Sequence, residues 1–248
     1  MGLTAGLTAL GIFIIGGSEQ AYWDWQLTHP YDLDINVRVL ALDKDDHERD
    51  TIMALRDRGV KPVCYVSVGS WEEYRDDKDS FPEEVLGKPL GDWPDERYVD
   101  IRDDRVMKIM QARLQDCADR GFMAAELDNM DVFENDSGFD ISEEAALTYV
   151  KNLAAYAHLL GLEVAQKNAP QLVPALVGTM DFIMVEECYA YDFCDALKPY
   201  TEAGKDVLAI EYDDADLDWD AICEDSKARG IKLLLKSHEI TAGGKSCN

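Results

Sequence analysis

The chain has 248 residues, 47% of them hydrophobic and 30% charged, a composition typical of a single globular domain. Its 24 basic residues are outnumbered by 50 acidic ones, which gives a net charge of −26. Such a surface repels nucleic-acid phosphates and anionic membranes and attracts cations, so we expect no nucleic-acid partner. Solubility or a saline habitat is the simpler interpretation of this charge, and a polycationic substrate is the more specific one.

The chain begins with an uncharged apolar run, LTAGLTALGIFIIGG, over residues 3–17. This run is too short for a typical transmembrane helix but fits the core of a secretory signal, although the usual preceding basic residues are missing. We therefore predict a signal peptide or N-terminal apolar segment over residues 1–21 and a single domain over residues 22–248. A secreted protein without stable membrane insertion after processing follows from this interpretation.

Eight short apolar runs predict eight strands in the rest of the chain. They are WDWQL (23–27), VRVLALD (37–43), KPVCYVSVG (61–69), MAAELDN (123–129), EVAQKN (163–168), FIMVEECY (182–189), VLAIEY (207–212) and KLLLKS (232–237). Several of them, such as VCYV and LLL, lack a polar–apolar alternation. That pattern is typical of a parallel sheet that is buried on both faces.

Amphipathic stretches with helical spacing separate the strands, as in residues 106–117 and 143–160. Glycines follow these stretches where helices often end in a left-handed residue. They are Gly59, Gly121, Gly161, Gly178, Gly204 and Gly230. The repeated order of strand, helix, glycine and strand predicts an α/β protein, a (β/α)8 TIM barrel. An open Rossmann-like sheet is the alternative, but no GxGxxG motif follows the first strand.

Residues 71–102, after the third strand, form an insertion that is too long for an ordinary βα loop. Long segments of this kind are often lids or binding elements, and a disordered surface insertion is the alternative. Five aromatic residues favour the ordered interpretation. They are Trp71, Tyr74, Phe81, Trp93 and Tyr98.

The six cysteines are an even number, which permits disulfides in an exported chain. The candidates for disulfides are Cys188, Cys194, Cys223 and Cys247. Cys64 and Cys117 lie in apolar patterns and are expected to be unpaired core thiols. Because no CxxC spacing occurs and the four histidines are scattered, we expect neither a metal site nor a cofactor.

In a (β/α)8 barrel the active site lies at the C-terminal ends of the strands, where this sequence places polar and aromatic residues. The substrate-binding candidates are Trp25, Gln26, Asp43, Tyr65, Trp71, Asn129, Asp131, Lys167, Asn168, Glu186, Tyr189, Glu211 and Tyr212. So many polar groups are costly in a core unless they are paired. Carboxylates beside aromatic rings suit sugar chemistry, because glycosidases use two carboxyl groups and aromatic faces bind sugar rings and cations.

Asp128 ends the predicted fourth strand and Glu187 the sixth, so their carboxylates can face each other across the barrel mouth. We predict that they are the catalytic pair; the alternative is that each only forms an ion pair with a basic residue such as Lys167. Neighbouring residues of a strand point to opposite faces, so only one of Glu186 and Glu187 is expected to face the mouth. We assign Glu187 to this position, and Glu186 is the alternative.

Segments of the sequence also resemble a known family, in order and over roughly residues 22–247. They are WDWQL, CYVSVGSWEEYR, FPEEVLGKPLGDWPDERYVDIR, ELDNMDVF, QKN, EECYAYDFC and IEYD. They are similar to glycoside hydrolase family 114, the endo-α-1,4-polygalactosaminidases. The resemblance implies an extracellular TIM-barrel enzyme that hydrolyses α-1,4-linked galactosamine polymers. It also implies catalysis by Asp128 and Glu187 and a disulfide between Cys188 and Cys194. The family commonly has Asn before its sixth-strand Glu, and here that residue is Glu186.

A polymer of free galactosamine is polycationic, and an acidic cleft attracts it. A nucleophile on strand four and an acid on strand six resemble the retaining α-galactosidase barrels, so we expect a covalent glycosyl-enzyme on Asp128. Two alternatives remain open. The same acid pair can act on another α-linked amino-sugar polymer, or the chain can be a non-catalytic, acidic polysaccharide-binding barrel. In each case the expected partner is a cationic polysaccharide and the expected state is a monomer.

Overall fold

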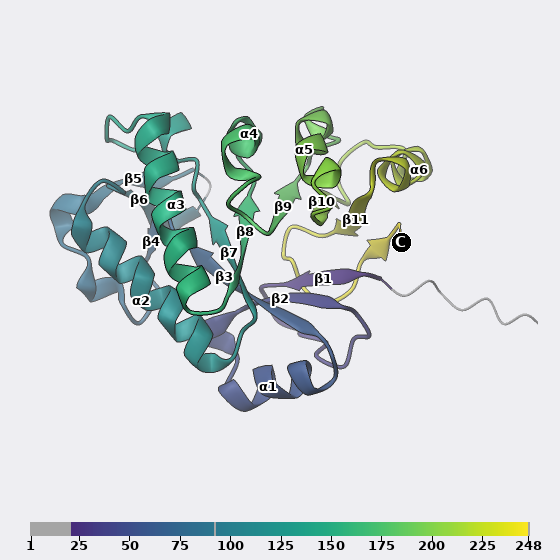
Figure 1. Cartoon of the computed structure of the whole chain (residues 1–248), viewed down its shortest axis with the longest axis horizontal. Helices are drawn as coiled ribbons and strands as arrows, with labels where there is room; N and C mark the ends of the chain where they lie inside the picture. Colours follow the sequence, from purple (N-terminus) through teal and green to yellow (C-terminus); the bar gives the residue numbers. More distant parts are fainter. Residues whose placement is uncertain (1–20, 92, 248) are drawn as a thin grey trace, which may run out of the picture.

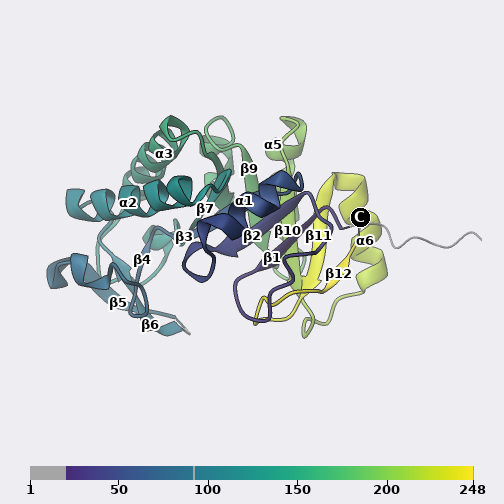
Figure 2. The same ribbon diagram turned by 90° about the horizontal axis from the view of Figure 1, so that it is seen from below.

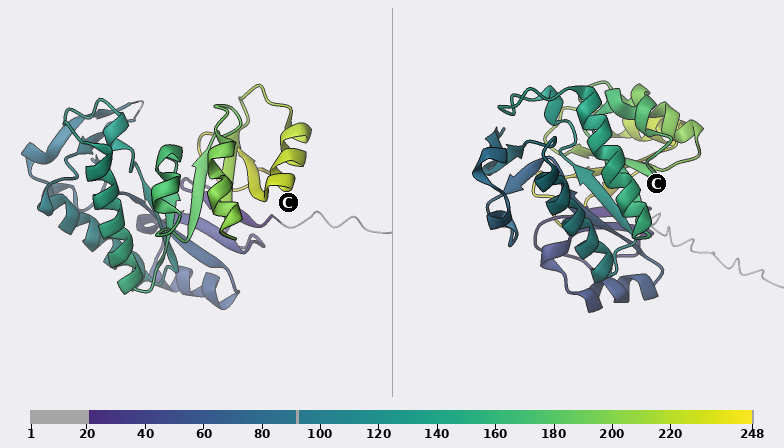
Figure 3. Two further views of the ribbon diagram at one scale, coloured as in Figure 1. Left: turned by 45° about the horizontal axis from the view of Figure 1, so that its top comes forward. Right: turned by 60° about the vertical axis from the view of Figure 1, so that its left-hand side comes forward.

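The computed structural model describes residues 21–91 and 93–247. Eight parallel strands lie in chain order in one curled sheet, with the helices along its outer side (Figure 1; Figure 3). The strands are β1 (Trp23–Gln26), β2 (Val39–Asp43), β3 (Lys61–Ser67), β7 (Ala124–Asp128), β8 (Glu163–Lys167), β9 (Phe182–Glu186), β10 (Val207–Tyr212) and β11 (Ile231–Lys236). All eight predicted strands are present, in a (β/α)8 fold. The expected export signal lies outside the described residues except for residue 21, so its boundary stays a prediction.

Helices connect the strands, as the sequence pattern predicts. The α-helices are α1 (Arg49–Asp57), α2 (Asp104–Arg120), α3 (Glu143–Leu159), α4 (Val173–Leu176), α5 (Lys198–Glu202) and α6 (Trp219–Arg229). The 3-10 helices are η1 (Lys44–Asp46), η2 (Lys78–Ser80), η3 (Glu83–Val85), η4 (Val132–Glu134), η5 (Pro170–Leu172) and η6 (Cys194–Leu197). Helix α3 begins after Ser142, whose hydroxyl accepts a hydrogen bond from the N–H of Ala145. Helix α2 ends at the left-handed Gly121, whereas Gly178 is not left-handed and the expectation for it is wrong. Within the described ranges, no helix is long and apolar enough to cross a bilayer.

Alternation along the strands divides the core into two layers. Alternate residues fill the barrel interior, among them Trp25, Val63, Ala165 and Met184. The residues between them pack outward against the helices, as Leu127 does from β7. Because side chains along a strand alternate between its faces, the last inward position of each strand lies at the C-terminal mouth of the barrel.

No backbone ladder links the first barrel strand, β1, with the last, β11, in the described part of the chain. Side chains connect these two strands instead. The indole N–H of Trp23 donates to the carbonyl oxygen of Lys232 at 2.9 Å. The buried ammonium of Lys236 binds Asp24 at 2.7 Å. The short strand β12 (Lys245–Ser246) then pairs antiparallel with β11.

The insertion after β3 is ordered, as its aromatic residues predicted. It forms an antiparallel sheet in the order β4-β6-β5, from β4 (Ser70–Glu72), β5 (Leu86–Leu90) and β6 (Trp93–Val99). We call this sheet the lid sheet; it lies at the opposite end of the molecule from α6 (Figure 2). Arg113 of α2 holds it by ion pairs with Glu72 and Asp77, both at 2.7 Å.

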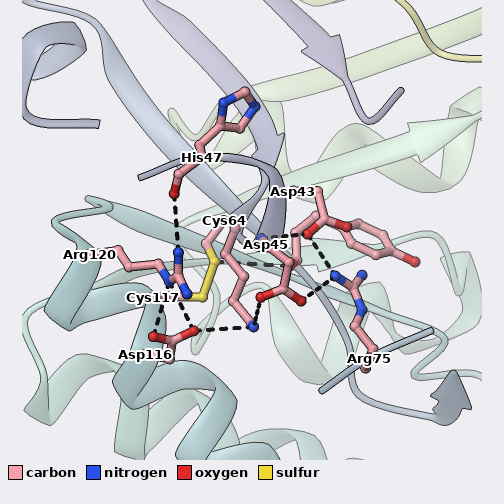
Figure 4. Close-up of a disulfide and its surroundings, with 10 residues drawn as sticks. Asp43, Asp45, His47, Cys64, Arg75, Asp116, Cys117 and Arg120 are labelled. Carbon is pink, nitrogen blue, oxygen red and sulfur yellow. Dashed lines mark hydrogen bonds and ion pairs between the residues drawn. A yellow bond between two sulfur atoms is a disulfide. The ribbon is translucent and has the colours of Figure 1, made fainter. Parts of the chain in front are cut away.

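The six cysteines form three disulfides: Cys64–Cys117, Cys188–Cys194 and Cys223–Cys247. The expectation that Cys64 and Cys117 are unpaired thiols is therefore wrong. Cys64 points outward from β3 and meets Cys117 on the inner face of α2, so the apolar environment of both positions reflects a buried disulfide (Figure 4).

Charged side chains surround this disulfide and connect α2 with the rim of the barrel (Figure 4). Asp116 accepts a hydrogen bond from Arg120 and forms an ion pair with Lys44 at 3.2 Å. Lys44 also contacts Asp45, which in turn binds Arg75 of the insertion at 2.7 Å. The network therefore orients acidic residues that lie beside the barrel mouth.

Candidate active site

A cavity of about 800 Å³ lies at the C-terminal ends of the barrel strands, between them and the lid sheet. Ten of the predicted residues line it. They are Trp25, Asp43, Tyr65, Asp128, Asn129, Asp131, Lys167, Asn168, Glu186 and Tyr212. The cavity has the size of a typical ligand site, so strand order brings these dispersed residues into one binding volume.

Asp128, Lys167 and Glu186 are the last residues of three consecutive strands, β7, β8 and β9. Ala165 and Met184, two residues before Lys167 and Glu186, belong to the interior core. The two-residue period of a strand therefore turns the charged side chains into the barrel mouth.

Lys167 is the centre of this group, and its side chain is only 3% exposed. Its Nζ lies 3.2 Å from Asp128 Oδ1 and 2.8 Å from Glu186 Oε2. The same nitrogen lies 4.6 Å from the centre of a Trp25 ring. Burial alone lowers the pKa of a lysine, but Asp128 and Glu186 hold the pKa of Lys167 well above its ordinary value. Lys167 is therefore a permanent cation between the two carboxylates.

The carboxylate of Asp128 is fixed on both oxygens. Tyr65 donates its hydroxyl to Oδ2 at 2.9 Å, and Lys167 donates to Oδ1. Burial, followed by the charge of Asp128, raises the pKa of Tyr65 well above its usual range, so the phenol keeps its proton. Asp128 remains 17% exposed at its side chain and is accessible from the cavity.

Glu186 has a similar set of donors. Lys167 and Asn168 bind Oε2, the latter at 3.0 Å, and the hydroxyl of Tyr212 donates to Oε1. Burial raises the pKa of Glu186, but these donors, led by Lys167, outweigh it and bring the pKa below the ordinary value. Glu186 is therefore a carboxylate in the free protein.

Glu186, and not Glu187, is the residue that lines the cavity. Glu187 follows the end of β9 with a left-handed backbone, φ 58°, and its N–H bonds to the carbonyl of Ile210. Burial and the adjacent Glu186 raise the pKa of Glu187. The expectation that Glu187 faces the barrel mouth is not met, because the inward face of β9 continues from Met184 to Glu186.

Glu126 lies one inward position below Asp128 and is completely buried. Neither of its carboxyl oxygens has a hydrogen-bond partner among the described residues, and Lys167 Nζ lies 3.5 Å from Oε1. Burial raises the pKa of Glu126 to about 8, so this carboxyl group is neutral at pH 7. Glu126 precedes Asp128 by one strand period in the sequence, but it lies before the strand end and so is not among the predicted site residues.

The remaining predicted residues lie outside the cavity and stabilise loops: Gln26, Trp71, Tyr189 and Glu211. Gln26 accepts the N–H of Asp32 at 2.8 Å, and the indole of Trp71 donates to the carbonyl of Lys78. Glu211 accepts the N–H of Tyr189 at 2.8 Å, which fixes the turn after β9. Their contacts are structural, and we do not retain them as substrate-binding candidates.

Several cavity residues were missed by the sequence analysis. Most come from the insertion and from the segment after β11, and they include Tyr74, Arg75, Trp93, Asp95, Glu96, His238 and Glu239. Tyr74 and Trp93 were recognised as lid aromatics but not as cavity residues. Extending the strand-end rule past Ser237 would have found His238 and Glu239, whereas no local signal distinguishes Glu96 from the other acids of the insertion.

The fold and cavity define a class of protein, the (β/α)8-barrel glycosidases, in which inward-facing carboxylates meet an open cavity at the barrel mouth. Comparison with known proteins gives the same class. Ega3 of Aspergillus fumigatus, solved with galactosamine, has 29% identity over 92% of this chain and 95% of its own, with a TM-score of 0.86. The glycoside hydrolase domain of PelA from Pseudomonas aeruginosa has 16% identity and a TM-score of 0.69, and covers 93% and 99%. At this identity, PelA supports the fold alone.

A curated relative, an uncharacterized protein of Thermotoga maritima, is 30% identical over 126 residues; the match spans 45% of this chain and 39% of the relative. The family model of glycoside hydrolase family GH114 matches residues 16–248, so the chain belongs to that family and is a glycosidase.

Proposed function

We propose that the protein is a secreted, endo-acting hydrolase of α-1,4-linked galactosamine polysaccharide, with Asp128 and Glu186 as its catalytic carboxylates. The observation that carries this proposal is the contact of one buried lysine, Lys167, with both carboxylates at the cavity. Similarity to Ega3, whose structure contains galactosamine, supports an amino sugar as the substrate. Three disulfides support an oxidising destination such as the cell exterior.

The spacing of the carboxylates supports retention of anomeric configuration. Their nearest oxygens lie 3.2 and 2.8 Å from the same nitrogen. They are therefore at most about 6 Å apart, closer to the roughly 5–5.5 Å of retaining enzymes than to the roughly 6.5–9.5 Å of inverting enzymes.

In the proposed first step, Asp128 attacks the anomeric carbon while Glu186 gives a proton to the glycosidic oxygen, and the leaving chain departs as an alcohol. In the second step, Glu186 takes a proton from water and the oxygen of that water displaces Asp128. Tyr65 and Lys167 hold the carboxylate of Asp128 in place for attack. Since Lys167 favours the ionised form of Glu186, the entering sugar must weaken this contact before Glu186 can act as the acid.

The rim of the cavity fits a cationic sugar chain. Tyr74 and Trp93 expose 61% and 62% of their surfaces and line the cavity, so they offer faces for sugar rings and ammonium groups. Asp95 and Glu239 add carboxylates to the lining of the same cavity. Aromatic surface next to negative charge favours a deacetylated polymer over a neutral, N-acetylated one.

The experiment is reducing-end release from deacetylated α-1,4-galactosamine polymer, comparing wild type with Asp128→Asn, Glu186→Gln and Glu187→Gln. We expect wild type to cleave, the first two variants to lose at least about a thousandfold in kcat, and Glu187→Gln to stay within about tenfold of wild type. Loss of activity in Glu187→Gln but not in Glu186→Gln would mean that Glu187, and not Glu186, is the second catalytic carboxylate. Cleavage of only the N-acetylated polymer would mean that the substrate is an N-acetylated sugar. Binding without cleavage would indicate a non-catalytic barrel.

Azide separates the two roles. In a retaining enzyme without its nucleophile, azide replaces the carboxylate and gives a glycosyl azide of inverted configuration, whereas without the acid/base it gives the retained product. We expect inversion with Asp128→Gly and retention with Glu186→Ala. The opposite pair of products would exchange the roles.

A further inference from the structure

The turn between β3 and β4 brings the lid sheet against the catalytic strand β7. Gly69 lies in this turn, and a Cβ atom placed on it would come within 1.8 Å of the carbonyl oxygen of Asn129. Gly69 also accepts a hydrogen bond from the N–H of Val99 at the end of β6, at 3.0 Å. Only glycine permits this close approach, so the lid sheet and the Asp128–Asn129 segment meet at one point.

Four buried or half-buried side chains bridge the same junction. Asn129 Nδ2 donates to Ser67 Oγ at 2.9 Å, Ser67 Oγ lies 2.6 Å from Ser70 Oγ, and Ser70 donates to Glu96 Oε2 at 2.7 Å. Asn129 Nδ2 also lies 3.5 Å from Asp128 Oδ2. Ser67 and Ser70 are both completely buried, so water does not compete for these hydrogen bonds.

We propose that Glu96 is a positioning residue for catalysis: through Ser70 and Ser67 it fixes the amide of Asn129 beside Asp128, so that docking of the lid sheet orders the catalytic carboxylate. This inference rests on the proposed role of Asp128. Glu96 acts on Asp128 only through the residues between them, because Glu96 lies on β6 in the insertion whereas Asp128 ends a barrel strand.

The direction of the hydrogen bonds explains why an acceptor is needed at position 96. Because Ser70 donates its only hydroxyl hydrogen to Glu96, Ser67 must donate to Ser70, and the oxygen of Ser67 is then left to accept from Asn129. The chain thus holds Asn129 with its NH₂ group toward Asp128. Without an acceptor at position 96, both serines can turn their hydrogens elsewhere, and the amide loses its fixed orientation.

Other groups around Glu96 hold it in this place. Tyr74 donates to its Oε1 at 3.3 Å, and Tyr74 also binds Glu72 at 3.0 Å. Burial, together with the nearby carboxylates of Glu72 and Asp128, raises the pKa of Glu96 to about 7. A neutral glutamine is therefore a mild replacement here, and its amide oxygen can still accept from Ser70.

The test compares Ser70→Ala and Glu96→Leu, which break the chain, with Glu96→Gln, which keeps an acceptor. Glu84→Gln is the matched control, since Glu84 is an exposed acid of the same insertion that pairs with Arg105. For wild type and all four variants we would measure kcat and KM on the deacetylated polymer, thermal unfolding, and hydrogen–deuterium exchange of the peptide that contains Asn129 and Asp131. Asp128→Asn reports on the proposed function independently.

We expect Ser70→Ala and Glu96→Leu to lower kcat by about ten- to a hundredfold with KM within about threefold, and to speed exchange at Asn129–Asp131. Glu96→Gln and Glu84→Gln should stay close to wild type in both readouts. A raised KM in both Glu96 variants with a normal Ser70→Ala would make Glu96 a substrate-binding group and overturn the proposal. Unchanged exchange at Asn129 in Ser70→Ala would also overturn it, whether or not the polymer is cleaved.

Discussion

The ammonium of Lys167 lies 2.8 Å from Oε2 of Glu186, on the inner face of two adjacent barrel strands, where the lysine side chain is almost fully shielded from water. At this depth a charge is stable only if it is paired, so the two side chains depend on each other for their ionised forms. The ionised state of Glu186 at the barrel mouth thus depends on Lys167.

Replacing Lys167 by Met should move the alkaline limb of the pH profile, because Glu186 must be protonated to act as the acid. Burial raises the pKa of Glu186, and the ammonium of Lys167 is the main group that lowers it. Without this ammonium, the pKa of Glu186 rises toward and beyond its ordinary value. Because Asp128 also loses the donor on its Oδ1, we expect kcat/KM at pH 7 to fall by at least about a hundredfold, and we expect its alkaline limb to shift to higher pH. Lys198→Met, at a side chain that is 72% exposed on α5, is the control. An unshifted profile would mean that Lys167 does not set the charge of Glu186.

Replacing Glu126 by Gln should change how stability depends on pH. The group is ionised above its ordinary pKa of 4.5 in the unfolded chain but keeps its proton up to about pH 8 in the folded protein. Its folded-state pKa is raised, so it destabilises the fold as pH rises from 5 to 8, by up to about 1.4 kcal/mol per pH unit.

Glu126→Gln removes this dependence, because an amide does not titrate. We expect the variant to have the same free energy of unfolding as wild type near pH 5 and to become relatively more stable toward pH 8, measured by urea denaturation. Glu224→Gln, on the exposed side of α6, should show no such trend. A constant difference between pH 5 and 8 would contradict a buried neutral carboxyl group.

The disulfide between Cys64 and Cys117 should contribute substantially to stability. It closes a segment of 53 residues, and the loss of chain entropy in the unfolded state corresponds to about 4 kcal/mol. The double variant Cys64→Ala, Cys117→Ala should therefore show a markedly lower free energy of unfolding, and reduction of all three disulfides should destabilise wild type at least as much. A Cys223→Ala, Cys247→Ala variant, whose loop spans 24 residues, tests whether loop length sets the effect.

Salt should weaken capture of the substrate more than catalysis. The net charge of −26 attracts a polycation over distances that added ions screen, so kcat/KM on the deacetylated polymer should fall with ionic strength while kcat changes little. A neutral, N-acetylated oligomer provides the comparison, since it lacks the ammonium groups. Equal salt dependence for both substrates would show that the acidity serves solubility alone.

Local sequence patterns were sufficient to predict the strands, the longer helices and most residues of the barrel mouth. Strand and helix periods depend on local geometry, and strand-end residues of a parallel barrel must gather on one edge, so Asp128, Lys167 and Tyr212 were found without a structure. The aromatic content of the insertion likewise predicted that it is ordered.

Which residues from distant segments come into contact depends on the packing of the whole fold. Apolar patterns around Cys64 and Cys117 indicate burial but not that a strand and a helix bring the two sulfur atoms together. The choice between Glu186 and Glu187 depends on where β9 ends and its backbone turns left-handed, which alternation alone does not fix. Glu96 joins the site because the insertion folds back onto the barrel, and contacts between segments so far apart in the chain are set by packing, not by local sequence.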